Sequence, residues 1–177
     1  MPRYLPASLV VIALLLLPHP ALPAQAEHAL SVGYGFALWN NGQTAGEVEE
    51  GNYDFFQASY LYEHPLSARW VLLVEPFVAY VNRPVDGVDV GFNLGVKVYP
   101  FSTDRQGFFF GAGTGSAYTS VNFREQGTHL LFILQASIGY RYKNFFIEDR
   151  WRHYSNGNTA SPNRSINANI LAVGMYF

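Results

Sequence analysis

The sequence predicts an all-β protein, an eight-stranded antiparallel transmembrane β-barrel. The first observation is that eight segments of about ten residues alternate between apolar side chains and small or polar ones. The second is composition, because charged residues make up only 14 % of the chain and aromatic residues 16 %, whereas a soluble domain carries about a quarter charged residues. The third is a last alternating segment that ends on the aromatic Phe177, which is typical of outer-membrane barrels.

Composition also excludes several other classes of protein. A mean hydropathy of +0.03 is too low for a bundle of membrane helices, whereas a barrel wall mixes lipid-facing and lumen-facing residues. The net charge of −2 offers no basic surface for nucleic acid. The absence of cysteine excludes disulfides and thiolate metal sites. Because His28, His64 and His129 have no metal-ligand spacing, we expect neither a metal nor another cofactor.

Residues 1–26 are predicted to be a signal peptide. Arg3 supplies the positive charge, residues 8–17 the apolar core, and 24–26 (Ala-Gln-Ala) the small residues of a cleavage site. The apolar run is about half the ~20 residues that a spanning helix needs. We therefore expect a barrel domain at residues 27–177 and export to the bacterial outer membrane.

The first four strands are predicted at residues 29–39, 53–63, 69–81 and 90–99. A polar loop at 40–52 follows the first strand, and its Glu47, Glu49 and Glu50 could bind divalent cations, although a solvated loop explains them as well. Pro76 is expected to mark a bulge, since proline cannot donate to the ladder. Asn93 and Lys97 fall on the inward face of the fourth segment, where a polar lumen can pair or hydrate them.

The other four strands are predicted at residues 107–118, 130–142, 145–155 and 166–177. Short turns alternate with longer polar connections, so an even strand count puts both termini in the periplasm and the long loops outside the cell. A soluble lipocalin-like barrel is the alternative fold, but it would place its apolar face inside. The signal peptide and Phe177 favour the membrane barrel.

Polar residues near the end of the seventh strand are candidates for chemistry. Glu148, Arg150 and Arg152 share one face, which must be the lumen, where they can pair with each other and with Glu75 or Lys97. His153 and Ser155 have the opposite parity and are expected to face lipid, with their Cβ atoms about 7 Å apart. A histidine can take the proton of such a serine. By itself the pair is a weak signal, because polar residues are ordinary at the headgroup level.

The surrounding motif is more specific. The segment HYSNG, which begins at His153, followed by the Pro162-Asn163 pair and a final aromatic strand, resembles the lipid A 3-O-deacylase family (PagL), outer-membrane barrels related to acyloxyacyl hydrolases. The resemblance implies a membrane-facing serine–histidine–acid site with Ser155 as nucleophile and His153 as base. It also implies hydrolysis of the ester that holds the primary hydroxyacyl chain at position 3 of lipid A in lipopolysaccharide.

One position departs from the family pattern. The family's third catalytic residue is a glutamate, and Asn167 stands at that position here. Parity agrees with this alignment, because Asn167 lies ten residues before the outward Phe177. An asparagine oxygen can accept the imidazole N–H but cannot offset the charge of imidazolium. A weak or inactive homologue therefore remains an alternative.

Other residues leave their roles open. Asn156, Gly157 and Asn163 are candidates for an oxyanion hole or substrate contacts, but the same residues form ordinary turns. Asp149 shares the parity of His153 yet lies about 13 Å along the strand, where a lipid-facing carboxylate is costly; a bulge or protonation would explain it. The alternative function is a non-catalytic outer-membrane barrel for adhesion or structural support. The sequence also leaves open whether the barrel works alone or as a homodimer.

Overall fold

The structure is a computed structural model that describes residues 25–38, 43–45 and 48–177; within 43–45 and 48–51 only the backbone is described. Residues 1–24 of the predicted signal peptide, Trp39 and Glu47 lie outside the described residues, and so do the side chains of Glu49 and Glu50. The signal peptide and the cation-binding loop therefore stay predictions.

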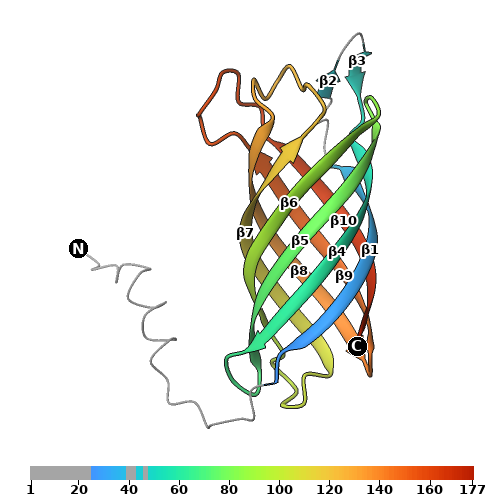
Figure 1. Ribbon diagram of the computed structural model, residues 1–177, viewed down its shortest axis with the longest axis vertical. Coiled ribbons are helices and arrows are strands. Elements are labelled where there is room, and N and C mark those ends of the chain that lie inside the picture. The colour runs from blue at the N-terminus through green and yellow to red at the C-terminus, as the bar shows by residue number, and fades with distance from the viewer. Residues whose placement is uncertain (1–24, 39–42, 46–47) are drawn as a thin grey trace, which may run out of the picture.

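Eight of the strands close into an antiparallel barrel, as predicted (Figure 1). The order around the wall is β1-β10-β9-β8-β7-β6-β5-β4, and β1 closes it by pairing with both β10 and β4. Closure leaves no strand edge with unpaired backbone N–H and C=O groups, which a sheet that spans a bilayer cannot have. The strands are β1 Glu27–Ala37, β4 Asp54–Pro65, β5 Trp70–Arg83, β6 Gly87–Val98, β7 Gly107–Thr119, β8 Leu130–Tyr142, β9 Phe145–Ser155 and β10 Ile166–Tyr176.

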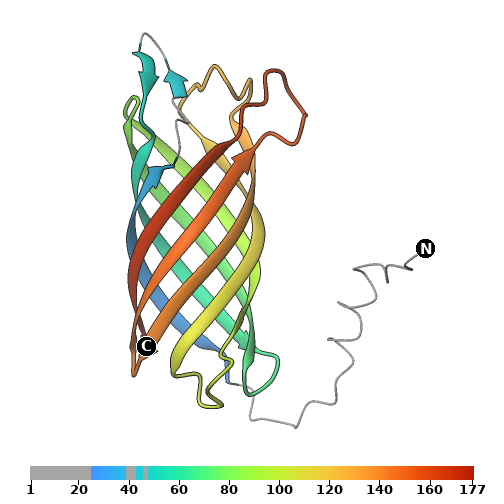
Figure 2. The ribbon, with the colours of Figure 1, turned by 180° about the vertical axis from the view of Figure 1, so that it is seen from behind.

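The connection predicted as a loop at 40–52 contains two further strands. β2 Gln43–Ala45 and β3 Val48–Gly51 form a small separate sheet. It lies beyond one end of the barrel, the end that also carries the β7–β8 and β9–β10 connections (Figures 1 and 2). We call this the loop end; β1 begins and β10 ends at the opposite end.

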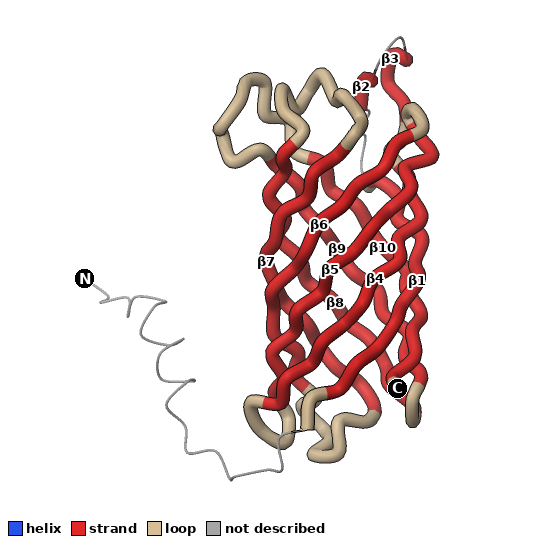
Figure 3. The backbone as a smooth tube through the Cα atoms, viewed as in Figure 1, coloured by secondary structure: helices blue, strands red, loops and turns tan. Residues whose placement is uncertain are grey.

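Connection lengths do not alternate as strictly as predicted. The β5–β6 connection at the loop end comprises only residues 84–86, whereas residues 99–106 connect β6 and β7 at the other end (Figure 3). The fourth strand was predicted to start at residue 90, whereas β6 starts at Gly87 and includes Asp89. In the structure Asp89 is buried in the lumen and accepts a hydrogen bond from the hydroxyl of Tyr53 (2.7 Å).

The bulge expected at Pro76 is absent. Pairing between β5 and β6 is continuous there, with Pro76 opposite Phe92. On the β4 side the same register holds before and after the proline, with Ser59 opposite Phe77 and Tyr62 opposite Val74. The missing N–H of proline interrupts the hydrogen bonds locally without adding a residue to the strand. The register shift lies instead at Asp54 and Phe55.

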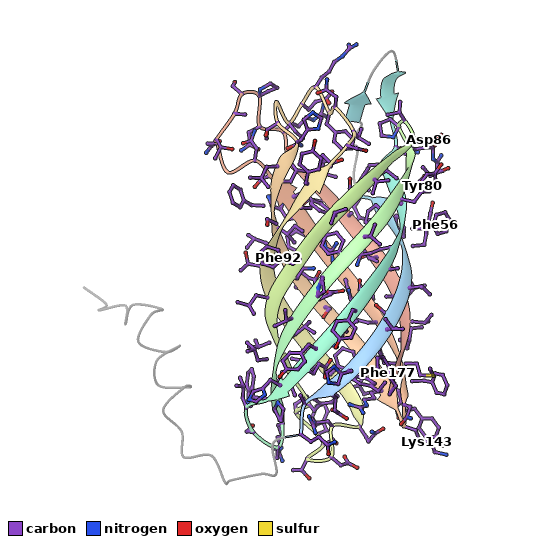
Figure 4. The ribbon with its side chains drawn as sticks, in the orientation of Figure 1. Phe56, Tyr80, Asp86, Phe92, Lys143 and Phe177 are labelled. Atoms are coloured by element: carbon purple, nitrogen blue, oxygen red, sulfur yellow. The ribbon has the colours of Figure 1, made fainter. Side chains whose placement is uncertain are left out.

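The outer wall carries the apolar side chains. Phe56, Phe92 and Phe177 project outward (Figure 4), with exposed fractions of 56 %, 53 % and 69 %. Among the residues the structure describes, no helix is long and apolar enough to cross a membrane. A wall of exposed aromatic and aliphatic side chains around a closed sheet requires lipid as its solvent.

The lumen is packed with paired charges. Lys97 donates to Glu63 (2.6 Å), and the Tyr176 hydroxyl donates to the same carboxylate (2.9 Å). Arg150 bridges Glu75 and Glu148, as predicted from parity. Arg152 donates to other groups of the lumen, Gln57 and Gln135. These side chains are at most 7 % exposed, so their charges are stable only because each has a partner.

Removing one member of such a pair should destabilise the barrel. Lys97→Met is expected to lower the free energy of unfolding by about 3–5 kcal/mol, because Glu63 keeps its charge in a buried site. Urea titration of the protein in detergent measures the loss. The folded fraction at each urea concentration is read from gel electrophoresis of unheated samples, in which folded and unfolded barrels migrate differently. The double variant Lys97→Met/Glu63→Gln should recover most of it; equal instability of the double variant would contradict the explanation.

Candidate active site

The register of β9 and β10 places His153 directly opposite Asn167. Parity predicts the outward face for both residues, and the register makes them direct neighbours. Both side chains lie on the lipid-facing side, because Arg152 and Ala168, the adjacent residues of opposite parity, are fully buried. The two strands therefore bring together residues fourteen positions apart in the sequence.

The imidazole of His153 is held by Asn167. His153 Nδ1 lies 2.8 Å from Asn167 Oδ1. Because a carboxamide oxygen only accepts, this hydrogen bond places the proton on Nδ1 and leaves the Nε2 lone pair free to act as a base. Trp151, the next outward residue on β9, packs beside the imidazole with ring centroids 6.1 Å apart. The ring is thus fixed from two sides.

Ser155 ends β9 on the same lipid-facing side. On the neighbouring strand β8, Phe132 lies opposite Ser155 and Leu134 lies opposite His153. Phe132 and Leu134 are 44 % and 57 % exposed. The hydroxyl and the imidazole therefore border an apolar surface rather than a water-filled cleft.

Asn156 fastens the loop that follows Ser155. Its side-chain nitrogen lies within hydrogen-bond distance of the carbonyl oxygens of Gln126 (2.6 Å), Ala160 (3.0 Å) and Pro162 (2.9 Å), and the residue is fully buried. Its backbone N–H donates to Asn163 Oδ1 (3.0 Å). The side chain of Asn156 is thus engaged within the loops, which corresponds to the turn role that the sequence left open.

The second asparagine of the motif is also held within this loop. Asn163 Nδ2 donates to Asn158 Oδ1 (2.9 Å), and both residues are exposed. The adjoining Arg164 N–H donates to the carbonyl of Glu125 in the β7–β8 connection (2.8 Å). Two connections distant in sequence therefore brace the segment after Ser155.

Gly157 lies against the apolar neighbour of the serine. Its φ of +61° is in the left-handed region, and a Cβ there would lie 2.9 Å from Cδ2 of Phe132. Both features favour glycine. The backbone of Gly157 therefore approaches the serine's surroundings more closely than any other residue type would allow.

Loss of the Asn156 amide should loosen this loop. Asn156→Asp keeps an oxygen for the Asn158 N–H but loses the donors to three carbonyl oxygens. Trypsin cleavage after Arg164, followed by gel electrophoresis in detergent, should become at least several-fold faster. Ser161→Ala, at an exposed position of the same loop, is the control and should change cleavage less. Equal rates for Asn156→Asp and the wild type would show that the amide does not hold the loop.

Asp149 also lies on the lipid-facing side, as parity predicted. The registers of β9 with β8 and with β10 are continuous through it, which excludes the suggested bulge. Asn169 Nδ2 donates a hydrogen bond to Asp149 Oδ1 (2.6 Å). Asn169 has the same parity as Asn167. The outward side of β9 and β10 therefore carries two successive hydrogen-bonded pairs, Asn169 with Asp149 and Asn167 with His153.

An apolar groove runs along the same side of the barrel, farther from the loop end. Its lining does not include Ser155, His153 or Asn167, among the residues the structure describes. The candidate site residues and the groove therefore occupy separate parts of this wall. The groove is lined by Leu30, Ser31, Val32, Tyr140, Tyr142, Phe145, Phe146, Ile147, Val173, Gly174 and Met175.

Sequence reasoning missed two contributors to the site. Asn169 is a polar residue at an outward position of the last strand, so the parity argument that located Asn167 could have found it. Phe132 carried no signal, because only the β8–β9 register reveals that it stands opposite Ser155.

A closed barrel with an apolar outer wall and a histidine–serine pair facing lipid defines the class: an outer-membrane barrel that carries polar groups where lipids reach them. A family model described as lipid A 3-O-deacylase (PagL) matches residues 28–176. The chain therefore belongs to the lipid A 3-O-deacylase family.

Solved structures agree on the fold. The crystal structure of the outer membrane enzyme PagL aligns with a TM-score of 0.58 and 18 % identity, covering 82 % of this chain and 98 % of that one. The outer membrane protein Ail of Yersinia pestis, in a phospholipid nanodisc, aligns with a TM-score of 0.53 and 14 % identity over 86 % of this chain and all of that one. No curated protein sequence matches. Family and fold together place this chain in the bacterial outer membrane.

Proposed function

We propose that this protein is a serine esterase that removes the 3-O-linked primary hydroxyacyl chain from lipid A. The observation that carries the proposal is the hydrogen bond between His153 Nδ1 and Asn167 Oδ1 on the lipid-facing wall, beside Ser155. It leaves Nε2 of the imidazole available to the serine. Family membership supplies the substrate class.

The chemistry proceeds in two steps. His153 Nε2 takes the proton of the Ser155 hydroxyl while the oxygen attacks the ester carbonyl, and the sugar oxygen leaves with that proton. Water then attacks the acyl-serine, again through His153, and releases a hydroxy fatty acid while restoring the serine. Asn167 keeps the proton on Nδ1 in both steps. No cofactor takes part in this scheme.

The negative oxygen that forms during attack needs a donor. The Asn156 side chain is bound to carbonyl oxygens of its own loop connections, and Asn163 Nδ2 donates to Asn158. We therefore assign the donor to the backbone N–H of Gly157, two residues beyond the nucleophile. Asn156 and Asn163 support it by holding the loop. One such donor is worth about 2.7–4 kcal/mol.

The surroundings of the site favour a lipid substrate. The lumen holds buried ion pairs such as Lys97–Glu63 and Arg150–Glu75, whereas Ser155 and His153 lie on the outer wall beside Phe132 and Leu134. An ester reaches this place laterally, from the membrane. A barrel serving adhesion or support would need no fixed imidazole on that surface.

Mass spectrometry of lipid A tests the proposal. Cells that produce the protein should contain lipid A lacking one primary hydroxyacyl chain at position 3, and cells with the empty vector should not. Purified protein should release the same hydroxy fatty acid from lipopolysaccharide in detergent. Unaltered lipid A in both experiments would favour the non-catalytic barrel.

A further inference from the structure

Asp149 is a carboxylate on a surface that otherwise selects apolar residues. Its outward neighbours on β9 are Ile147 and Trp151, which are 49 % and 37 % exposed. Charged groups are costly on the lipid side of a barrel strand. Because the strand register is regular, the position is not an accident of a bulge, and the charge calls for an explanation.

Its partner fixes the orientation of an amide. Asn169 Nδ2 donates to Asp149 Oδ1 at 2.6 Å, since an amide nitrogen is a donor only. One outward position farther along β10, Asn167 presents its Oδ1 to His153. The order along the wall is therefore carboxylate, amide, amide, imidazole.

The reaction lacks a negative charge at the position where the family pattern has a glutamate. Asn167 accepts the Nδ1 proton but cannot offset the imidazolium that forms when His153 takes the serine proton. Asp149 is a carboxylate on the same face of the same strand as His153, four residues away. Resting on the function proposed above, we infer that Asp149, held by Asn169, is a positioning residue that compensates the charge of His153 during catalysis.

Distance and medium decide the size of the effect. Four residues along a strand separate the two groups by about 13 Å. Lipid and the protein wall screen a charge far less than water does. For unit charges about 13 Å apart and an effective dielectric constant of about 20, the interaction corresponds to about a tenfold change in rate.

A double-mutant cycle on purified lipopolysaccharide in detergent tests the inference. Asp149→Asn keeps a hydrogen-bonding side chain but removes the charge, and should lower kcat about tenfold with KM unchanged. Asp149→Glu keeps the charge and should retain the wild-type kcat. In the Asn167→Glu background, Asp149→Asn should again lose about tenfold, because two carboxylates act additively on the imidazolium. Asp104→Asn, at an exposed turn between β6 and β7, is the charge-matched control and should leave kcat unchanged.

The outcomes separate this inference from the proposed function. An equal loss of kcat in Asp149→Asn and in the charge-retaining Asp149→Glu would show that Asp149 acts through folding or lipid packing, and would overturn the inference while the esterase stands. So would an unchanged kcat in Asp149→Asn. Absence of deacylation in the wild type and in Asn167→Glu alike would overturn the esterase and the inference with it. Gel electrophoresis of unheated samples verifies that the barrel of each variant is folded.

Discussion

Replacing Ser155 by alanine is expected to abolish release of hydroxyacyl chains while the barrel still folds and inserts. The side chain lies on the outer wall at the end of β9, so its loss opens no buried cavity. Without the hydroxyl, His153 has no nucleophile to activate, and such a loss costs about 10⁶ in kcat in a serine hydrolase. Fatty-acid release from lipopolysaccharide measures activity, and heat-modifiable gel mobility measures folding.

The barrel supplies a matched control for this experiment. Ser116 on β7 and Ser155 on β9 both pair with Phe132 on β8, so the two serines lie at the same level of the wall. The residues opposite Ser116 on the two neighbouring strands are Phe92 and Phe132, so neither of its cross-strand partners is a histidine. Ser116→Ala should therefore retain full activity. Near-normal deacylation by Ser155→Ala would disprove the serine-esterase mechanism.

Changes at Asn167 are expected to move activity in opposite directions. The wild type should show weak but measurable deacylation, because an asparagine orients the imidazole without offsetting its charge. Asn167→Ala removes the hydrogen bond to His153 Nδ1 and should greatly lower or abolish activity. Asn167→Glu restores both functions of a carboxylate and should maintain or raise it. In the reverse direction, replacing a triad aspartate by asparagine costs about 10⁴ in kcat.

The measurement is the deacylation rate of the three proteins side by side in the same detergent. Asn167 is partly exposed on the outer side of β10, so both substitutions should leave the barrel stable in cold gels. Activity of Asn167→Ala equal to that of the wild type would mean that another group orients His153. Activity of Asn167→Glu below that of Asn167→Ala would mean that the carboxylate is misplaced.

Strand alternation predicted most of the fold because it reports directly on the two faces of a barrel wall. The period of two placed Lys97 and Arg150 inside and His153 outside, and all three assignments are confirmed. Glu148, Arg150 and Arg152 of β9 need the lumen, so one parity fits the strand, and Asp149 is its exception on the lipid-facing side. The same parity, counted from Phe177, placed Asn167 on the face of His153, and the register sets the two opposite each other.

Alternation carries less information where the strands end. The predicted fourth strand left out Asp89, which lies in the lumen with Tyr53, a partner beside β4 and two strands away in the barrel. The small β2–β3 sheet was likewise invisible in a polar segment. Pro76 illustrates the converse, since a residue that breaks many strands here costs only local hydrogen bonds.

The sequence by itself determined the barrel, the alternation of its strand faces, and the shared lipid-facing side of His153, Ser155 and Asn167. Only the tertiary structure decided how these residues are supported: Asn156 held by the carbonyl of Gln126 from another connection, Phe132 opposite Ser155, and Asn169 bound to Asp149. A period of two specifies which way a side chain points. It does not specify which residue of another strand or loop lies within hydrogen-bond distance, because that depends on register and on contacts between segments far apart in the chain.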